Sequence, residues 1–450
     1  MSESITIRKG LDINLRGKAE KVFIKADTTG KYAVKPVDFP GLTPKLAVEE
    51  GSEVKAGSVL FYDKANTEIK FTSPVSGKVF EIVRGDRRKL LEVIIESDGK
   101  NESEQFLQAD PSSSDRATVV SNLLNSGLWP AIKQRPYNII ANPALSPKSV
   151  FISGFDSAPL GVDFDFIMQD HLKEFQAGID ALAKLTDGKV HLGINGKYPP
   201  NPAFANVKNV QVNRFIGKHP AGNVGTHIHY IDPVNKGEIV WTTDPQSVVT
   251  IGRLFITGKY DASKTIALAG SEVLRPRYYK VISGCSIEPL IKENVTDKPL
   301  RCISGNVLTG TRIAPDGYLG FYDSMFTVIP EGNKHEFMGW LAPGFSKFSA
   351  SRLFFSWLNP KREYIVDTNV KGGRRALMIT GSFEKVFPFD ILPMQLLKAI
   401  IIEDIDLMEK LGIYEVAEED FALCEFIDTS KTDIQAIVRK GLDLMAKEMN

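Results

Sequence analysis

The sequence predicts a multi-domain α+β protein, and three observations favour this class. The chain has 450 residues, and at roughly 150 residues per domain this corresponds to about three domains. Apolar residues first alternate as in short β-strands, and beyond a polar stretch at Ser97–Ser114 strand-like runs alternate with helical ones. From Pro393 onward the apolar residues are spaced three and four apart, as in amphipathic helices.

We expect five consecutive parts. They are an N-terminal segment (1–32), an all-β unit (33–99), an α/β unit (100–260), a second β-rich unit (261–375) and a helical unit (376–450). The polar stretch marks the boundary between the first two folded units, because its Ser, Asp, Gly and Asn residues are typical of turns and linkers.

The all-β unit reads as two similar halves, each with a turn, Val54–Gly57 in the first and Ser73–Gly77 in the second. Residues Glu49–Val79 resemble the barrel-sandwich hybrid fold of biotinyl and lipoyl carrier domains, with Lys64 at the hairpin that carries the lipoyl lysine. Two interpretations of Lys64 stay open. It is either an attachment site or a solvated lysine in a turn of a structural module.

The α/β unit alternates strand-like and helical stretches, which indicates a Rossmann-like layer. We expect strands at Tyr137–Ala141, Ser149–Ile152, Val190–Ile194 and Asn209–Phe215, and helices at Ala117–Asn125 and Asp163–Leu185. No two glycines are separated by one residue, so the G-x-G-x-x-G dinucleotide loop is absent. The β-runs of Lys264–Ile329 follow, and the tail presents the apolar stripe Leu396, Leu397, Ile400, Ile401, Ile405, Leu407 and Met408, which predicts a docking helix.

Composition excludes several classes of function. The 55 Lys and Arg residues balance 55 Asp and Glu residues, so no excess charge attracts nucleic acid. No run of about 18 uncharged apolar residues exists to cross a membrane, and nothing at the N-terminus indicates export, so we expect a cytoplasmic protein. The cysteines, Cys285, Cys302 and Cys424, have no C-x-x-C spacing and predict reduced thiols. P-loop, G-x-S-x-G and H-E-x-x-H motifs are missing.

Several longer motifs carry a resemblance to one family. They are Ser126–Ile140 (SGLWPAIKQRPYNII), Phe151–Phe166, Gly217–Pro233 (GKHPAGNVGTHIHYIDP), Thr250–Arg277, Ser304–Thr311, Phe337–Arg352 and Tyr414–Asp428. Together they make the chain similar to the A subunits of sodium-translocating NADH:quinone reductases, over essentially its whole length. The resemblance implies barrel-sandwich hybrid, Rossmann-like, β-grasp (SLBB-like) and C-terminal helical domains, in that order.

The same resemblance implies a function and partners. It implies a peripheral subunit on the cytoplasmic face of the bacterial inner membrane, in a six-subunit complex that oxidises NADH, reduces ubiquinone or menaquinone and exports Na⁺. The complex uses flavins and iron–sulfur centres, and its membrane-embedded B subunit is the expected neighbour. The isolated chain is expected not to be catalytic.

More distantly, the chain resembles the C subunit of the Rnf complex and the flavoprotein subunit of respiratory complex I. In those relatives a glycine-rich loop admits flavin phosphate near the position of Gly127–Pro136. Here Trp129 and Ile132 fill that space, and Pro130 lacks a backbone donor. Cys424 stands alone where those relatives hold iron–sulfur clusters. We therefore predict that this chain binds no cofactor.

Trp129, Arg135 and Tyr137 are the candidate quinone-binding residues. They combine ring surface with donors for the carbonyl oxygens of a quinone headgroup. The alternative is that the two rings are core or subunit-interface anchors and that Arg135 pairs with a carboxylate. A scaffold subunit that never touches quinone is the corresponding alternative function.

His227 and His229 stand two residues apart, so on a strand they face one side, with His219 nearby as a third ligand for zinc. Ordinary hydrogen-bonded histidines are the alternative, and no metal site is predicted, because zinc needs three or four convergent ligands.

Two charged groups remain. Val370–Arg375 (VKGGRR) concentrates three positive charges around two glycines, either as a solvated loop or against lipid phosphates or an acidic subunit face. Glu418, Glu419 and Asp420 predict only the start of a helix, where negative charge is favourable.

Overall fold

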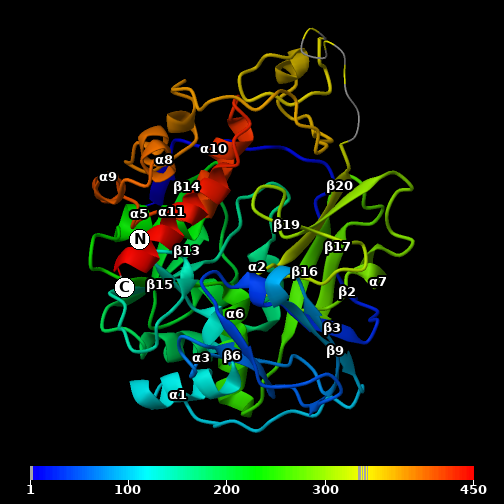
Figure 1. The fold of residues 1–450 in the computed structure, drawn as a ribbon, viewed down its shortest axis with the longest axis vertical. Coiled ribbons are helices and arrows are strands. Elements are labelled where there is room, and N and C mark those ends of the chain that lie inside the picture. Colours follow the sequence, from blue (N-terminus) through cyan, green and yellow to red (C-terminus); the bar gives the residue numbers. More distant parts are fainter. Residues whose placement is uncertain (1–3, 333–335, 337, 339–340, 342, 450) are drawn as a thin grey trace.

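Figure 1 shows the computed structural model of the chain, which describes residues 4–332, 336, 338, 341 and 343–449. Part of the motif Phe337–Arg352 therefore lies outside the described residues.

The predicted all-β unit forms two small antiparallel sheets with a shared apolar core, in which the stacked rings of Phe61 and Phe71 lie with centroids 4.7 Å apart. One sheet has the order β3-β9-β8-β5 and the other β4-β6-β7. The strands are β3 (Lys31–Val34), β4 (Pro44–Leu46), β5 (Glu53–Val54), β6 (Val59–Asp63), β7 (Lys70–Thr72), β8 (Gly77–Arg84) and β9 (Leu90–Ser97).

The α/β unit is built on a seven-stranded sheet of order β1-β14-β13-β12-β15-β10-β11. The first five of these strands are parallel, and β10 runs antiparallel to β15. β12 (SVFIS) is almost wholly buried, as strands covered on both faces are. The strands are β1 (Ser4–Ile7), β10 (Lys133–Arg135), β11 (Ile139–Ile140), β12 (Ser149–Ser153), β13 (Lys189–Asn195), β14 (Gln211–Gly217) and β15 (Val240–Thr243). The helices are α1 (Arg116–Ser126), α2 (Phe164–Ile167), α3 (Leu172–Ala183), α4 (Pro202–Ala205), α5 (Val224–Ile231) and α6 (Pro245–Thr257).

Two predicted elements of this unit are shorter than expected. The stretch Asp163–Leu185 is two helices, because the Asp163 carboxylate caps α2 and the backbone at His171 leaves the helical region before α3 begins. Of the predicted strand Tyr137–Ala141 only β11 pairs, because Tyr137 and Asn138 have positive φ angles of 81° and 53°.

A six-stranded mixed sheet follows, with the order β19-β18-β20-β16-β17-β2. Its strands are β2 (Glu20–Lys25), β16 (Ser263–Ala269), β17 (Arg277–Ile282), β18 (Leu300–Ser304), β19 (Thr311–Ile313) and β20 (Met325–Pro330), and α7 (Glu288–Ile291) lies between β17 and β18 in the chain. The N-terminal residues are therefore not a separate segment, since β1 pairs with β14 of one sheet and β2 pairs with β17 of another.

The C-terminal helices have an apolar core of their own. The predicted stripe does not form one docking helix, because it is divided between residues 393–401 and 405–410. Leu396, Leu397, Ile400 and Met408 are buried, whereas Ile401 and Leu407 are exposed. The first of the two helices packs against the last helix of the chain. The helices are α8 (Pro393–Ile401), α9 (Ile405–Lys410), α10 (Ala422–Ile427) and α11 (Ile434–Met449). Across the described part of the chain, no helix is both long and apolar enough to cross a membrane.

Candidate functional site

Trp129 lies in a short 3₁₀ turn, Trp129–Ala131, directly after α1. The turn is possible because Gly127 ends α1 with φ 75°, and a Cβ atom there would lie 2.4 Å from the Thr72 hydroxyl oxygen of β7. The Trp129 side chain is fully buried, donates from Nε1 to the Ala141 carbonyl oxygen at 2.7 Å, and packs edge-on against Trp241. Its only hydrogen-bond donor is thus used inside the α/β unit.

Arg135, at the end of β10, is fully buried and bound on three sides. It donates to the Asp420 carboxylate at 2.7 Å, to the Glu419 carboxylate at 2.8 Å and to the Glu415 carbonyl oxygen at 3.1 Å. Burial disfavours the charged guanidinium, but these carboxylates outweigh it and raise the pKa of Arg135. Arg135 therefore joins β10 of the seven-stranded sheet to the 3₁₀ turn Glu418–Phe421, which directly precedes α10.

Tyr137 follows Arg135 on the same turn and also faces the C-terminal unit. Its ring packs edge-on against Tyr414, with centroids 6.4 Å apart, and its carbonyl oxygen accepts from Arg439 at 2.8 Å. Asn138 donates to Glu418 at 3.1 Å, which holds the second residue of this left-handed turn. Burial raises the pKa of the Tyr137 hydroxyl, which makes no hydrogen bond to any residue that the structure describes.

The structure thus brings Arg135 and Tyr137 together, and Trp129 lies apart in the core. We call the boundary made by Arg135, Tyr137, Tyr414, Glu419 and Asp420 the Arg135 cluster. The prediction that the three acidic residues at 418–420 only start a helix was incomplete, because all three bind side chains of or beside this cluster. The sequence contains no signal for these pairs, since Asp420 stands 285 positions after Arg135.

The three candidate zinc ligands do not converge. His227 and His229 lie on helix α5 and not on a strand, so two positions of separation turn them to different sides. The run Val224–Ile231 forms a helix and not a strand, because as a helix it buries an apolar face on the sheet. His219 contacts the Ser157 hydroxyl at 3.0 Å and His229 contacts Glu415 at 2.5 Å. Among the described residues, no three His, Cys, Asp or Glu side chains are grouped to hold a metal ion.

His227 is enclosed most completely. Its Nε2 atom donates to the Ala221 carbonyl oxygen at 2.9 Å, and its ring stacks on Phe215 at 4.0 Å between centroids. Burial lowers the pKa of His219 to about 4 and the pKa of His227 to about 4, so both imidazoles are neutral at pH 7.

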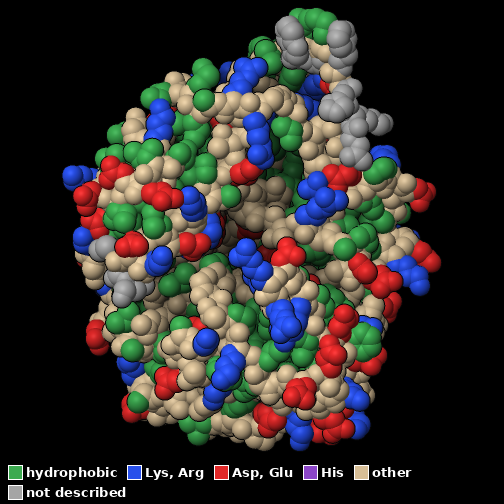
Figure 2. Space-filling view, viewed as in Figure 1, with side chains coloured by type: hydrophobic (Ala, Val, Ile, Leu, Met, Phe, Trp, Pro, Cys, Tyr) green, Lys and Arg blue, Asp and Glu red, His purple; other side chains and the backbone are tan. Residues whose placement is uncertain are grey.

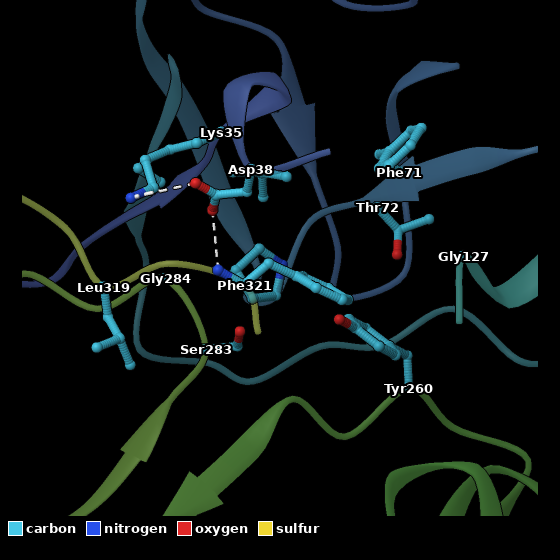
Figure 3. Close-up of a pocket in the computed structure, with 13 residues that line it drawn as sticks. Lys35, Asp38, Phe71, Thr72, Gly127, Tyr260, Ser283, Gly284, Leu319 and Phe321 are labelled. Atoms are coloured by element: carbon cyan, nitrogen blue, oxygen red, sulfur yellow. Dashed lines mark hydrogen bonds and ion pairs between the residues drawn. The ribbon is translucent and has the colours of Figure 1, made fainter. Parts of the chain in front are cut away.

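A small cavity with a mostly apolar lining lies between the all-β unit and the six-stranded sheet (Figure 3). It encloses about 20 Å³, room for about one water molecule. Asp38 points across it, accepts from the Phe321 backbone N–H at 2.8 Å and lies 3.6 Å from the Lys35 amino group. Burial raises the pKa of Asp38, which Lys35 opposes. This cavity is too small for a flavin or a quinone ring.

A larger surface groove of about 370 Å³ runs beside α3. It is lined by Asp110, Pro111, Leu172, Lys173, Gln176, Ala177, Asp180, Ala203, Asn206 and Val207. No aromatic ring lines it, so it lacks the stacking surface that a quinone headgroup needs.

Lys64 is exposed at the turn after β6, and its backbone N–H donates to the Thr43 carbonyl oxygen at 2.8 Å. The three cysteines are buried, and burial raises the pKa of each thiol, so each is protonated at neutral pH.

Comparisons with known proteins define the class. The sequence matches family models for the NqrA N-terminal barrel-sandwich hybrid domain at residues 5–98, the NqrA second alpha/beta domain at 114–260 and the NQRA C-terminal domain at 265–314. These models together span most of the chain, and the first agrees with the barrel-sandwich hybrid fold expected from Glu49–Val79. The chain is thus a mixed α/β protein made of the domains of one subunit type.

Full-length relatives identify that type. The A subunit of the Na(+)-translocating NADH-quinone reductase of Hahella chejuensis is 38% identical over 452 residues, covering 99% of this chain and 100% of the relative. The A subunit of Pasteurella multocida is 38% identical and that of Vibrio anguillarum 37%, each covering 99% of this chain and 100% of the relative. The chain belongs to the family of A subunits of the Na⁺-translocating NADH-quinone reductase, as its motifs predict.

Among solved structures, an NAD⁺-reducing [NiFe]-hydrogenase in the H₂-reduced state aligns with 75% of this chain and 62% of its own, at a TM-score of 0.40 and 11% identity. A likeness at this level supports no argument about fold or function.

Proposed function

We propose that the chain is a peripheral subunit of a Na⁺-translocating NADH:quinone reductase and takes part in quinone reduction coupled to Na⁺ export. The observation that carries this proposal is the similarity to the A subunits of such reductases over 99% of the chain and 100% of the relatives. We place the protein on the cytoplasmic face of the bacterial inner membrane, held there by the other subunits and above all by the membrane-embedded B subunit.

The proposal assigns the redox cofactors, NADH, flavins and iron–sulfur centres, to the other subunits. Two features of this chain support that assignment. By the resemblance to distant flavin-binding relatives, the Trp129 ring, which is buried here, would occupy the space that their glycine-rich loop leaves for flavin phosphate. Each cysteine is buried as a separate thiol. An absorption spectrum of the purified chain with a flavin band would contradict it.

We assign the quinone contact to the Arg135 cluster. A quinone headgroup needs an aromatic face and a donor to a carbonyl oxygen. Tyr137 has a ring and a hydroxyl group. The hydroxyl has no hydrogen-bond partner among the described residues, and the ring makes an edge contact with Tyr414 that leaves its face for the headgroup in our proposal. Arg135 positions Tyr137 by fixing the turn to Asp420, and Trp129 supports the same loop from the core side.

A titration of the full chain with a short, water-soluble ubiquinone analogue tests the quinone contact. We expect saturable binding that weakens by about tenfold in Tyr137→Phe, the loss expected for one hydrogen bond to a ligand oxygen. Tyr198→Phe, which removes an exposed hydroxyl elsewhere in the α/β unit, is the matched control. Trp129→Ala is expected to weaken binding too, together with stability.

One observation favours the alternative of a pure scaffold. Trp129 already uses its side-chain donor within the chain. Of the three guanidinium nitrogens of Arg135, only Nε has no hydrogen-bond partner among the described residues. Absence of binding at millimolar quinone analogue, with an intact complex, would favour the scaffold and remove the quinone contact from this chain. A lipoylated carrier is the remaining alternative, and an intact mass equal to the unmodified chain would end it.

The finer fold assignments belong to the same proposal. The strand order β14-β13-β12-β15 supports a Rossmann-like layer. Numbered along the chain from β12, it is 3-2-1-4, the order of doubly wound sheets, in which the fourth strand lies beside the first. The six-stranded mixed sheet supports a β-grasp assignment for 261–375, and the helices after Pro393 support a helical domain for 376–450. The domain boundaries after residue 32 stay predictions.

A further inference from the structure

Residues 343–379, which we call the loop segment, expose an unusual number of apolar side chains. Nine of the 25 large apolar side chains that are exposed among the described residues lie there. They are Phe345, Leu353, Phe355, Trp357, Leu358, Ile365, Val370, Met378 and Ile379. Exposed apolar surface of this extent marks an interaction site on a folded protein.

The loop segment is held in place by the rest of the fold. The backbone of Tyr364 exchanges hydrogen bonds with Asn14 and Arg16, at 2.7 and 3.0 Å. Arg375 N donates to the Ser430 carbonyl oxygen at 2.9 Å, and the Phe348 ring packs against Phe426 of α10. The exposed rings thus sit on a fixed support, which lowers the entropy cost of binding a partner.

Charge is concentrated on the same segment. It contains seven basic residues (Lys347, Arg352, Lys361, Arg362, Lys371, Arg374 and Arg375) and two acidic ones (Glu363 and Asp367), a net charge of 7 − 2 = +5 in a chain of net charge zero. Lys347 pairs with Glu336 and Arg374 with Asp433, whereas Arg352, Lys361, Lys371 and Arg375 are exposed. In Figure 2, blue and green side chains share the upper end of the molecule and red ones are few there.

The backbone conformation of the loop segment favours a protein over lipid as its binding partner. Its only regular structure is one 3₁₀ turn, Phe355–Leu358, so most of its N–H and C=O groups have no helix or sheet partner. In hydrocarbon such groups have no partner and cost several kcal/mol each, whereas a protein surface supplies donors and acceptors. Aromatic side chains, Met and Arg are also the residues enriched at protein interfaces.

We propose that the loop segment docks against another subunit of the reductase, at a surface with an apolar centre rimmed by acidic side chains. This inference rests on the proposed function, since it takes the partner from the same complex. Phe345, Phe355 and Trp357 bury their rings in the apolar centre, and Arg352 and Lys361 face the acidic rim. Figure 1 shows the segment projecting beyond the C-terminal helices, at the end of the molecule far from β6 and β9.

The test uses the complete complex. All subunits are co-expressed, the complex is purified through a tag on another subunit, and the amount of this chain per complex is measured. In Phe355→Ser/Trp357→Ser and in Arg352→Glu/Lys361→Glu we expect retention of the chain to fall by about tenfold or more, since interface anchors carry most of the binding energy. Lys197→Glu/Tyr198→Ser, equally exposed on the α/β unit, is expected to stay at the wild-type amount.

Each other outcome is informative. Unchanged retention of both variants overturns the proposal. Salt-sensitive binding of the full chain to vesicles with anionic lipid, lost in the charge variant while retention in the complex stays, assigns the segment to the membrane instead. Self-association in analytical ultracentrifugation that the apolar variant abolishes, again with retention unchanged, assigns it to a second copy. If the wild-type and control chains do not join the complex at all, the proposed function fails first. The thermal midpoint of each isolated variant shows whether it has folded.

Discussion

Arg135 places a guanidinium group in a site with almost no exposed surface, and the Asp420 carboxylate beside it is equally buried. Removing one partner of such a pair leaves an uncompensated charge in the interior. We therefore predict that Arg135→Ala lowers the free energy of unfolding by about 3–5 kcal/mol, measured by urea denaturation.

An exposed pair in the same chain provides the control. Arg374 and Asp433 form an ion pair at a similar distance, 2.8 Å, with both side chains mostly in solvent. Arg374→Ala is expected to change stability by less than about 1 kcal/mol. Equal losses in the two variants would contradict the role of Arg135 as the buried link between the sheet and the C-terminal helices.

The buried histidines predict a dependence of stability on acid. Burial lowers the pKa of His219 to about 4 and the pKa of His227 to about 4. In the unfolded chain a histidine titrates near pH 6.5, so between about pH 6.5 and 4 the unfolded state binds more protons and stability falls as pH falls. Each imidazole is expected to contribute about 1.4 kcal/mol per pH unit in this window.

The measurement is the urea midpoint of the full chain from pH 7 to pH 4, compared with that of His227→Asn, which keeps a donor for the Ala221 carbonyl oxygen. The variant is expected to be less stable at pH 7 and to lose stability less steeply on acidification. A slope identical to that of the wild type would show that His227 does not stay neutral in the folded state.

At this scale the sequence offers two interpretations of Arg135, and the structure shows the pairing with carboxylates that one of them expects. The role of Arg135 and Tyr137 in quinone binding stays a prediction. Arg135 and Tyr137 stand out in the sequence because a fixed charge and a ring lie two positions apart. Their partners belong to the C-terminal part of the chain, and pairing over such distances leaves no local pattern. On a strand His227 and His229 would face one side, but they lie on α5, because the alternation in His-Ile-His-Tyr covers only four positions and does not separate a strand from a helix.

Helices α3 and α6 cross at two glycines. A Cβ atom on Gly252 would lie 1.8 Å from the Glu174 carbonyl oxygen, and one on Gly178 would lie 2.1 Å from that of Val248. Gly252→Ala must therefore push the two helices apart, and we predict a loss of about 1–3 kcal/mol in the free energy of unfolding. Gly373→Ala, where nothing lies within 4 Å, is the control and is expected to change little. A neutral Gly252→Ala would mean that the helices do not cross this closely.

Elements with strong local patterns were predicted well. The runs Ser149–Ile152, Val190–Ile194 and Asn209–Phe215 contain most of β12, β13 and β14. For β12 and β13 the signal is the buried, largely apolar run typical of parallel strands, whereas β14 alternates polar and apolar residues and is partly exposed. Helix α1 carries both its signals in sequence, Asp115 as N-cap and Gly127 as C-cap. The strands β1 and β2 were missed, because they are short and their partners, β14 and β17, lie far along the chain.

The N-terminal and C-terminal parts of the chain link its folded units to one another. The N-terminal residues supply one strand to the seven-stranded sheet and one to the six-stranded sheet. Glu415 and Asp420, between α9 and α10, bind α5 and the Arg135 turn. Both ends therefore fix how the α/β unit meets its neighbours. In our proposal the face around the Arg135 cluster meets quinone and the loop segment meets a partner subunit.

The most direct test of the proposed function is to purify the complete reductase with and without this chain and to compare its NADH-driven reduction of a short ubiquinone with that of an artificial electron acceptor. We predict that omission of the chain abolishes quinone reduction, that NADH oxidation by the artificial acceptor continues, and that adding back the wild-type chain restores the quinone activity. Full quinone reduction by a complex that lacks the chain would contradict the proposed function.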